Sequence, residues 1–181
     1  GILGGGQLGK MLINVARKWS IQTYILDPNP DCPASKCCDL FFNGDFNSYE
    51  DVYNFGKKVD IITIEIEHVN VKALYKLEDE GVAVYPSPSN IELIQNKGVQ
   101  KDFFKKNKIP TSNYKRFDNK KALSKYISRI ESSYPFIWKS ETMGYDGKGV
   151  KLVKSLSDLD EINENSCVIE DLVDIKHELA V

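Results

Sequence analysis

Two glycine-rich segments of the chain have the composition of phosphate-binding loops. The first, GGGQLG at residues 4–9, matches the pattern G-x-G-x-x-G. The second, MGYDGKG at residues 143–149, contains three glycines and a lysine and closely follows Lys139 at the end of an apolar run. Glycine lets the backbone approach a ligand, and exposed N–H groups and lysine ammonium groups attract an anion. We therefore expect both segments to bind phosphate groups.

The first segment admits three interpretations. It could bind a nicotinamide or flavin dinucleotide, because it joins a predicted strand to a predicted helix and Asp27 follows at about the distance of a ribose-binding acid. It could instead be a tight turn whose glycines only let the strand pack closely on the helix. It could also bind another phosphate-bearing ligand at the N-terminus of the helix.

Four glutamates at predicted strand ends could orient a polar ligand. Glu65 and Glu67 follow an apolar strand, and two acids spaced by two residues point to the same side of an extended segment. Glu170 ends another apolar strand and Glu178 opens the next apolar stretch, where a carboxylate could accept ribose hydroxyls. Strand ends are also commonly solvated surface, and His68 could equally be a surface or helix-capping residue.

The first half of the chain alternates predicted strands and helices. Apolar residues at helical spacing predict a helix over 8–19, and a β-branched run predicts a strand over 59–66 that is buried on both faces. The other expected elements are a strand at 21–26, helices at 49–58 and 71–80, and a strand at 82–85. This alternation predicts a mostly parallel, Rossmann-like α/β sheet.

The proline-rich segment at residues 86–89 interrupts this alternation and predicts a boundary between domains 1–88 and 89–181. The expected later elements are helices from about Ile91, over 99–107, over 119–132 and over 157–162, and strands at 136–139, 149–153, 167–170 and from 177. The strands at 136–139 and 149–153 are predicted to form a hairpin across the second glycine-rich segment.

Composition excludes several classes of protein. The 181 residues carry 24 basic and 26 acidic side chains, and this balance argues against nucleic-acid binding through a general positive field. No apolar run approaches the roughly 18 residues of a membrane-spanning helix. The four cysteines and two histidines lack the spacing of a zinc site, so we expect reduced thiols and a cytoplasmic protein.

Taken together and in order, these motifs resemble the ATP-grasp carboxylate–amine ligases, and within them the 5-(carboxyamino)imidazole ribonucleotide synthases. The similar segments are GGGQLGKML at 4–12, ILDPNPDCPA at 25–34, EIEHV at 65–69, YPSPSNIELIQNKGVQKDFF at 85–104, KIPT at 108–111, GYDGKGV at 144–150 and VIEDLVDIKHELAV at 168–181. No single segment is decisive, but GGGQLG together with GYDGKG is much more specific than either alone.

The resemblance implies a Rossmann-like preATP-grasp domain at 1–88 and the N-terminal portion of an ATP-grasp domain at 89–181. It implies that the ribonucleotide is bound with help from Gly6, Gln7, Leu8 and Glu67. The residues implied to bind ATP are Lys97, Lys139, Gly144, Tyr145, Asp146, Gly147, Lys148, Gly149, Val150, Glu170, Asp171, Leu172, Val173 and Glu178. Of these, Tyr145, Asp146 and Lys148 are implied to be catalytic, since they would face the place where phosphate, bicarbonate and amine meet.

The implied reaction belongs to purine biosynthesis and converts ATP, bicarbonate and 5-aminoimidazole ribonucleotide into the carboxyamino product, ADP and phosphate. Carboxyphosphate, the implied intermediate, decays quickly in water, so residues 144–149 are expected to act as a lid. The family's Mg²⁺-binding carboxylates lie downstream of residue 181. The resemblance therefore implies no metal ligands within this chain, a fragment that is inactive alone, and a homodimer at full length.

Three other functions remain as alternatives. Another ATP-grasp ligase, such as a formate-dependent glycinamide ribonucleotide transformylase, a biotin-carboxylase-like enzyme or a D-alanine ligase, would share part of these motifs. An NAD- or FAD-dependent oxidoreductase would use residues 4–9 and Asp27 but would leave Lys139 and the second glycine-rich segment without a role. The third alternative is a nucleotide-binding module without catalytic activity.

Overall fold

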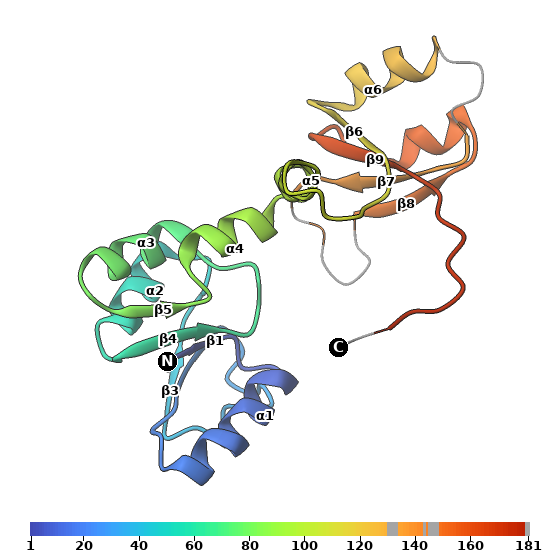
Figure 1. Ribbon diagram of the computed structural model, residues 1–181. Coiled ribbons are helices and arrows are strands. Elements are labelled where there is room, and N and C mark those ends of the chain that lie inside the picture. The colour runs from blue at the N-terminus through green and yellow to red at the C-terminus, as the bar shows by residue number, and fades with distance from the viewer. Residues whose placement is uncertain (130–133, 143, 145–148, 180–181) are drawn as a thin grey trace. The chain divides into compact units, whose positions relative to one another are not determined.

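The computed structural model describes residues 1–129, 134–142, 144 and 149–179. The chain divides into two compact units, Gly1–Glu92 and Leu93–Val181, each with its own sheet (Figure 1). The predicted boundary after residue 88 falls at the start of α4 (Pro88–Gln95), and the division between the units lies inside this helix. Proline is well tolerated at the first position of a helix, where its missing N–H is not needed.

A five-stranded parallel sheet forms the centre of the first unit. Its strands are β1 (Ile2–Leu3), β2 (Tyr24–Asp27), β3 (Leu40–Asn43), β4 (Ile61–Ile64) and β5 (Ala83–Tyr85). They lie in the order β3-β2-β1-β4-β5, and every neighbouring pair is parallel. The predicted Rossmann-like sheet is thus confirmed. The prediction that its β-branched strand is buried on both faces is wrong for most of β4. Ile62 is buried, but Ile61, the first residue of β4, is 52% exposed, and Thr63 and Ile64 are half-buried.

Helices cover both faces of this sheet. They are α1 (Gln7–Ala16), α2 (Tyr49–Gly56) and α3 (Val71–Asp79), followed in the chain by α4. Successive residues of a strand point to opposite faces. Leu3 accordingly packs in the core beneath α2 and α3, whereas Ile2 packs with Ile13 of α1. Ser48 and Asn70 fix the starts of α2 and α3, because each side chain accepts a hydrogen bond from a backbone N–H three residues on.

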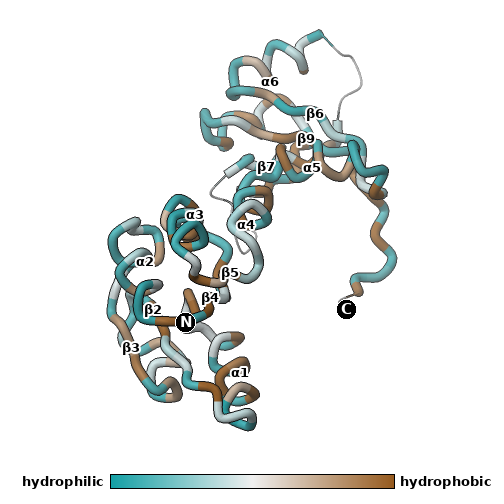
Figure 2. The backbone as a smooth tube through the Cα atoms, turned by 60° about the vertical axis from the view of Figure 1, so that its left-hand side comes forward, coloured by the Kyte–Doolittle hydropathy of each residue, from teal (hydrophilic) through white to brown (hydrophobic). Residues whose placement is uncertain are grey.

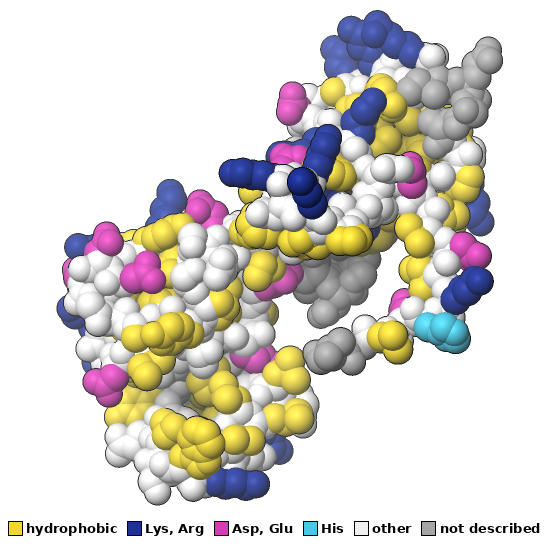
Figure 3. All heavy atoms as spheres, in the orientation of Figure 1, with side chains coloured by type: hydrophobic (Ala, Val, Ile, Leu, Met, Phe, Trp, Pro, Cys, Tyr) yellow, Lys and Arg dark blue, Asp and Glu magenta, His cyan; other side chains and the backbone are white. Residues whose placement is uncertain are grey.

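The outward face of α1 is apolar. The spacing that predicts this helix is confirmed, but most of the apolar side chains that define it lie away from the sheet. Leu8 is 65% exposed and Trp19, in the short 3₁₀-helix η1 (Arg17–Trp19), is 77% exposed. Met11, Leu12 and Val15 are exposed as well. Hydrophobic segments along α1 appear in brown in Figure 2, and hydrophobic side chains over the same helix appear in yellow in Figure 3.

A four-stranded antiparallel sheet forms the centre of the second unit. Its strands are β6 (Tyr114–Phe117), β7 (Phe136–Ser140), β8 (Val150–Val153) and β9 (Cys167–Asp171), in the order β6-β9-β7-β8. The accompanying helices are α5 (Lys97–Lys106), α6 (Lys120–Ile127) and the 3₁₀-helix η2 (Leu156–Glu161). The predicted hairpin is confirmed, since β7 and β8 pair with Lys139 opposite Val150. Strand β6 is a further element, which the sequence did not predict.

The two faces of this sheet differ. One face packs against α6 and η2 in a core that contains Leu123, Trp138 and Leu159. Because side chains alternate along a strand, Lys139 and Glu170 lie on the opposite face from Trp138. This second face is where α5 approaches β9, through an ion pair between Lys101 and Glu170. Lys139 and Glu170, both predicted to bind ATP, are therefore kept apart from the hydrophobic core of the unit.

Three predictions for the second unit need correction. Helix α6 ends at Ile127, within the expected range 119–132, of which residues 130–132 lie outside the described part. The helix expected over 157–162 is the short 3₁₀-helix η2. Residues 172–179 form neither helix nor strand, so a strand beginning at residue 177 is not found in the described part of the chain. A strand needs a neighbour that bonds its N–H and C=O groups, and no described strand pairs with this segment.

Over the residues that the structure describes, no helix is both long and apolar enough to cross a membrane. The four cysteines are free thiols, and Cys32 and Cys167 are buried.

Candidate functional site

The first candidate site lies where the strand order of the parallel sheet reverses. β1 pairs with β2 on one side and with β4 on the other, and open α/β sheets bind ligands beyond the carboxyl ends of strands at such a point. The first glycine-rich segment follows β1 and Glu65 follows β4. The backbone N–H of Glu65 donates a 2.8 Å hydrogen bond to the carbonyl of Leu3. The structure thus brings the predicted loop and the predicted acidic segment together.

The carboxylate of Glu65 lies directly against the glycines of this turn. A Cβ atom on Gly6 would be 2.5 Å from Oε1 of Glu65, and one on Gly4 would be 2.6 Å from Oε2. Gly4 also has a φ of +96°, which side-chain-bearing residues rarely adopt. The glycines are therefore needed to make room for an acid, and this acid disfavours a pyrophosphate on the turn while favouring a ligand group that donates hydrogen bonds.

Asp27 supports the turn from behind. Its Oδ2 accepts a 2.7 Å hydrogen bond from the N–H of Gly5, and its Oδ1 accepts a 2.8 Å bond from the N–H of Asn29. The side chain is buried, so both oxygens are used inside the protein. Asp27 does not have the exposed carboxylate that a dinucleotide ribose would require. If residues 4–9 bound a dinucleotide, Asp27 would therefore not be available to contact its ribose.

The four residues predicted to bind the ribonucleotide follow β1 or β4. Gly6 caps the N-terminus of α1, and Gln7 and Leu8 are the first, exposed residues of that helix. Glu67 is exposed, and its Oε1 lies 3.6 Å from Nε2 of His68. Glu65, which the resemblance did not single out, is the acid that lies against the glycines. The roles of the four residues in binding stay predictions.

The second candidate site is centred on the buried carboxylate of Glu170, at the end of β9. Its Oε1 lies 2.9 Å from Nζ of Lys139 on the neighbouring strand β7. Its Oε2 accepts hydrogen bonds from Oγ of Ser112 at 2.6 Å and from Nζ of Lys101 at 2.9 Å. Lys139 and Glu170, which were predicted as separate ATP contacts, are thus held together, with one carboxylate between two lysines.

This cluster carries a surplus of positive charge. Burial raises the pKa of the Glu170 carboxyl, but the contacts with Ser112, Lys139 and Lys101 lower it, and the pKa lies below its ordinary value. Glu170 is therefore ionised at neutral pH, and its single negative charge faces two ammonium groups. Such a cluster suits an anionic ligand, because lysine binds a phosphate oxygen as a compact point charge.

Lys97, the first residue of α5, reaches the beginning of the second glycine-rich segment. Its Nζ donates a 2.6 Å hydrogen bond to the carbonyl of Gly144, and its backbone N–H donates a 2.8 Å bond to the carbonyl of Glu141. The buried carboxylate of Glu141 is in turn held by Arg116, with N–O distances of 2.6 and 3.0 Å. These bonds fix the N-terminus of α5, which carries a partial positive charge, beside the end of β7.

The remaining residues of the second glycine-rich segment were predicted to bind ATP, three of them also as catalytic residues. Tyr145, Asp146, Gly147 and Lys148 lie outside the described residues, so these roles stay predictions. Gly149, with a φ of +73°, leads directly into Val150 at the start of β8, and its carbonyl accepts a 2.8 Å hydrogen bond from the N–H of Ser140.

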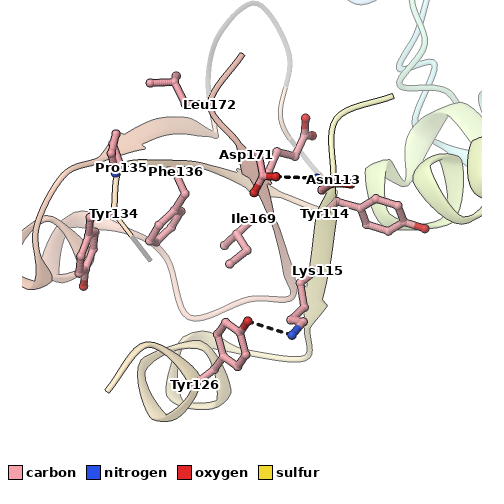
Figure 4. Close-up of a pocket in the computed structure, with 11 residues that line it drawn as sticks. Asn113, Tyr114, Lys115, Tyr126, Tyr134, Pro135, Phe136, Ile169, Asp171 and Leu172 are labelled. Atoms are coloured by element: carbon pink, nitrogen blue, oxygen red, sulfur yellow. Dashed lines mark hydrogen bonds between the residues drawn. The ribbon is translucent and has the colours of Figure 1, made fainter. Parts of the chain in front are cut away.

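The segment predicted to line the adenine and hold the ribose continues from the end of β9. The carboxylate of Asp171 accepts a 2.8 Å hydrogen bond from the side-chain amide of Asn113 (Figure 4). Leu172, Val173 and Glu178 follow in the unpaired stretch 172–179 and are exposed. Their predicted contacts with the nucleotide stay predictions.

A cavity of about 750 Å³ lies between the start of β7, β6, β9 and α6 (Figure 4). Tyr126, Phe136 and Ile169 are among its lining residues, and the Nζ of Lys115 donates a 2.9 Å hydrogen bond to the hydroxyl of Tyr126. Its lining also includes Glu170, Asp171 and Leu172 from the predicted adenine segment. Its described lining residues do not include Lys97, Lys139 or Gly144, which the family resemblance predicts to bind ATP. We therefore do not place a triphosphate in it.

Comparison with protein families accounts for both units. A family described as the ribonucleotide synthetase preATP-grasp domain matches residues 1–95, and the ATP-grasp domain matches residues 102–181. The chain belongs to the ribonucleotide synthetases of the ATP-grasp family. Its parallel sheet is the preATP-grasp domain, and its antiparallel sheet is the N-terminal part of the ATP-grasp domain.

Two curated relatives illustrate the match. The chain is 41% identical over 166 residues to phosphoribosylaminoimidazole carboxylase of Candida glabrata, which covers 89% of this chain and 29% of that protein. It is 32% identical over 188 residues to N5-carboxyaminoimidazole ribonucleotide synthase of Staphylococcus epidermidis, which covers 100% of this chain and 48% of that protein. The chain thus spans less than half the length of these relatives.

Solved structures agree with this assignment. Carboxyaminoimidazole ribonucleotide synthase of Aspergillus clavatus, solved with ATP, superimposes with a TM-score of 0.86 and 34% identity over 97% of this chain and 47% of that chain. The enzyme from the same organism, solved with ADP and 5-aminoimidazole ribonucleotide, gives a TM-score of 0.81 and 32% identity over 97% and 46% of the two chains.

The sequence interpretation missed several groups that build the second site. Lys101, Ser112, Arg116 and Glu141 were not proposed as functional residues, although they hold the two predicted lysine positions. Lys101 and Ser112 do lie in two segments quoted for the resemblance or next to them, NKGVQKDFF and KIPT. Their role depends on contacts with a strand 69 and 58 positions later in the chain, and no local pattern reports such contacts.

Proposed function

We propose that the intact protein is an ATP-dependent ligase that carboxylates the amine of 5-aminoimidazole ribonucleotide with bicarbonate. The observation that carries this proposal is the cluster in which Glu170 lies between Lys101 and Lys139, in a domain whose relatives have been solved with ATP and with ADP. The acid-lined turn beside Glu65, in the preATP-grasp domain, supports a second substrate that donates hydrogen bonds.

In this proposal the second unit binds the phosphates of ATP. Lys139 and Lys97 contact phosphate oxygens, and residues 144–149 close over them. Both lysines stabilise the negative charge that develops while the terminal phosphoryl group passes to bicarbonate. Among the described residues, no group of three or more His, Cys, Asp or Glu side chains is arranged to hold a metal ion. The Mg²⁺ ligands expected downstream of residue 181 stay a prediction, and bound Mg²⁺ would neutralise part of the phosphate charge.

The first unit binds the ribonucleotide in this proposal, with help from Gly6, Gln7, Leu8 and Glu67. Transfer of the phosphoryl group to bicarbonate yields carboxyphosphate and ADP. The exocyclic amine then attacks the carboxyl carbon, a C–N bond forms, the C–O bond to phosphate breaks, and the amine loses a proton. Carboxyphosphate must be kept from water until this step, which makes closure of residues 144–149 a requirement of the reaction.

The proposal is tested with the intact protein by measuring ADP release. We expect release to require ATP, bicarbonate and 5-aminoimidazole ribonucleotide together, and the carboxyamino product to form in equal amount. Replacing bicarbonate with formate should abolish product formation. Formylation of glycinamide ribonucleotide with formate would identify the transformylase alternative instead. A Lys139→Met variant serves as the control, since it should lose ATP-dependent turnover while its fold is retained.

A further inference from the structure

The two oxygens of Glu170 are held very differently. Oε2 accepts two well-formed hydrogen bonds, from Ser112 at 2.6 Å and from Lys101 at 2.9 Å. Oε1 lies 2.9 Å from Nζ of Lys139, yet it has no hydrogen bond of good geometry among the described residues. The carboxylate is therefore fastened by two hydrogen bonds through Oε2, whereas Oε1 faces Lys139 in an ion pair.

Lys101 has no donor left for a ligand. Besides Glu170, its Nζ donates to Oγ1 of Thr111 at 2.6 Å and to Oγ of Ser112 at 3.0 Å, which uses all three ammonium protons. Its side chain is 11% exposed, while that of Lys139 is 27% exposed. Of the two lysines that flank Glu170, Lys139 is thus the one that a ligand can reach.

The ammonium group of Lys101 also determines whether Lys139 can leave Glu170 to bind a phosphate. With Lys139 as its only partner, the buried carboxylate would be left uncompensated whenever that ammonium turned to a phosphate, and an uncompensated buried charge is strongly unfavourable. Lys101 removes this conflict, because Glu170 keeps one cation and one hydroxyl donor at all times. The pair Lys139–Glu170 can then separate partly without exposing a bare charge.

We propose that Lys101, together with Ser112, is a positioning residue for Lys139. Lys101 and Ser112 hold Glu170 by Oε2, so that Oε1 orients the ammonium group of Lys139. The ammonium group stays free to bind a phosphate oxygen. This inference rests on the proposed function, because it assigns Lys139 to the phosphates of ATP. It adds a residue of α5 and a residue of the loop before β6 to the nucleotide site, neither of which touches the nucleotide.

The test uses the intact protein and measures ATP affinity by calorimetry and the KM of each substrate. Lys101→Met should raise the Kd and KM for ATP about tenfold and leave the KM for the ribonucleotide unchanged. Lys101→Arg keeps the charge and should restore most of the affinity. Ser112→Ala should give a smaller loss of about threefold and serves as the second variant if Lys101→Met does not fold. Lys105→Met, an exposed lysine one turn further along α5, is the matched control and should behave as wild type.

A double-mutant comparison separates positioning from direct contact. In a Glu170→Gln background, Lys101→Met should change ATP affinity less than about twofold, because the group through which Lys101 acts is gone. An equal loss in both backgrounds would mean that Lys101 binds phosphate itself, which overturns the inference. Wild-type ATP affinity in both Lys101→Met and Ser112→Ala would also overturn it and would leave the proposed function intact. Absence of ATP binding by the wild-type protein would instead overturn the proposed function.

Discussion

The ammonium group of Lys97 donates a 2.6 Å hydrogen bond to the carbonyl oxygen of Gly144. This bond joins the first residue of α5 to the beginning of the glycine-rich segment that is proposed to close over phosphates. A carbonyl oxygen and a phosphate oxygen are both acceptors for an ammonium group, but the phosphate carries a charge and forms the stronger bond. Under the proposed function, Lys97 would hold Gly144 when the site is empty and would bind the nucleotide when it is present.

A Lys97→Met variant should weaken ATP binding. Loss of one charge-assisted contact is expected to raise the Kd about tenfold or more, as measured by calorimetry on the intact protein. Lys97→Arg keeps the positive charge and should lose less. Lys106→Met, at the other end of α5, is the control. An unchanged Kd in Lys97→Met would remove this lysine from the nucleotide site.

Substitution of Glu65 and of Glu67 tests which of these two acids contributes to binding of the ribonucleotide. Glu65→Gln should raise the KM for the ribonucleotide about tenfold, since this carboxylate lies against the glycine turn. Glu67→Gln, whose carboxylate is exposed beside His68, tests the residue that the family resemblance favours. The KM for ATP should stay unchanged in both variants. If either substitution weakened both substrates equally, the assignment of the ribonucleotide to the first unit would have to be revised.

Two glycines with similar backbone angles form a matched pair for stability. Gly4 has a φ of +96° and is crowded by Glu65, whereas Gly81 has a φ of +91° with nothing within 4 Å of a Cβ position. Gly81→Ala should cost about 1 kcal/mol, because only the backbone is strained. Gly4→Ala should cost about 1–3 kcal/mol more, since the methyl group must also displace Glu65. Chemical denaturation measures both values, and equal losses would show that Glu65 moves aside freely.

Acid should remove one stabilising contact between α2 and the C-terminal end of α3. Hydrogen bonds from Lys76, Lys57 and Tyr53 lower the pKa of Glu80 to about 2. The unfolded chain has a pKa near about 4.3 at this position. The contribution of Glu80 to folding is therefore complete above that value and is lost as the pH falls through about 2. Glu80→Gln should unfold more easily than wild type at neutral pH, and the difference between their denaturation midpoints should vanish towards pH 2.

The parallel sheet could be predicted from the sequence because its signals are local. Most strands and helices of the first unit have their own apolar spacing, although strand β3 was not predicted. The glycine turn and Glu65 follow their strands directly in the chain. Strand β6 could not be predicted in the same way. Its two central residues, Lys115 and Arg116, are charged, and the strand is held by pairing with β9, whose partner residues lie at least 50 positions later. Such a long-range pairing produces no pattern in the sequence of either segment from which it could be predicted.

Burial was harder to predict than secondary structure. The apolar residues of α1 predict a helix, yet Leu8, Met11 and Leu12 are among those that face away from the sheet. Periodicity reports that a helix has an apolar face, but it does not say whether the described part of the chain covers that face. The same limit applies to the side chains around Glu170. Lys139 and Glu170 could be chosen from the sequence, while the fastening of Glu170 by Lys101 and Ser112 appears only once α5 and β9 are packed together.

The bond between Asp27 and Gly5 also bears on how the first unit would receive its ligand. The buried Asp27 accepts a hydrogen bond from the amide group of Gly5, in the loop after β1, and another from that of Asn29, just after β2. The loop after β1 is therefore held in place without a ligand. Under the proposed function, the ribonucleotide would meet a preorganised surface, and little of its binding free energy would be spent on restricting backbone motion. Asp27→Asn would keep one acceptor but lose the charge, and it should slow the association of the ribonucleotide even though Asp27 never touches it.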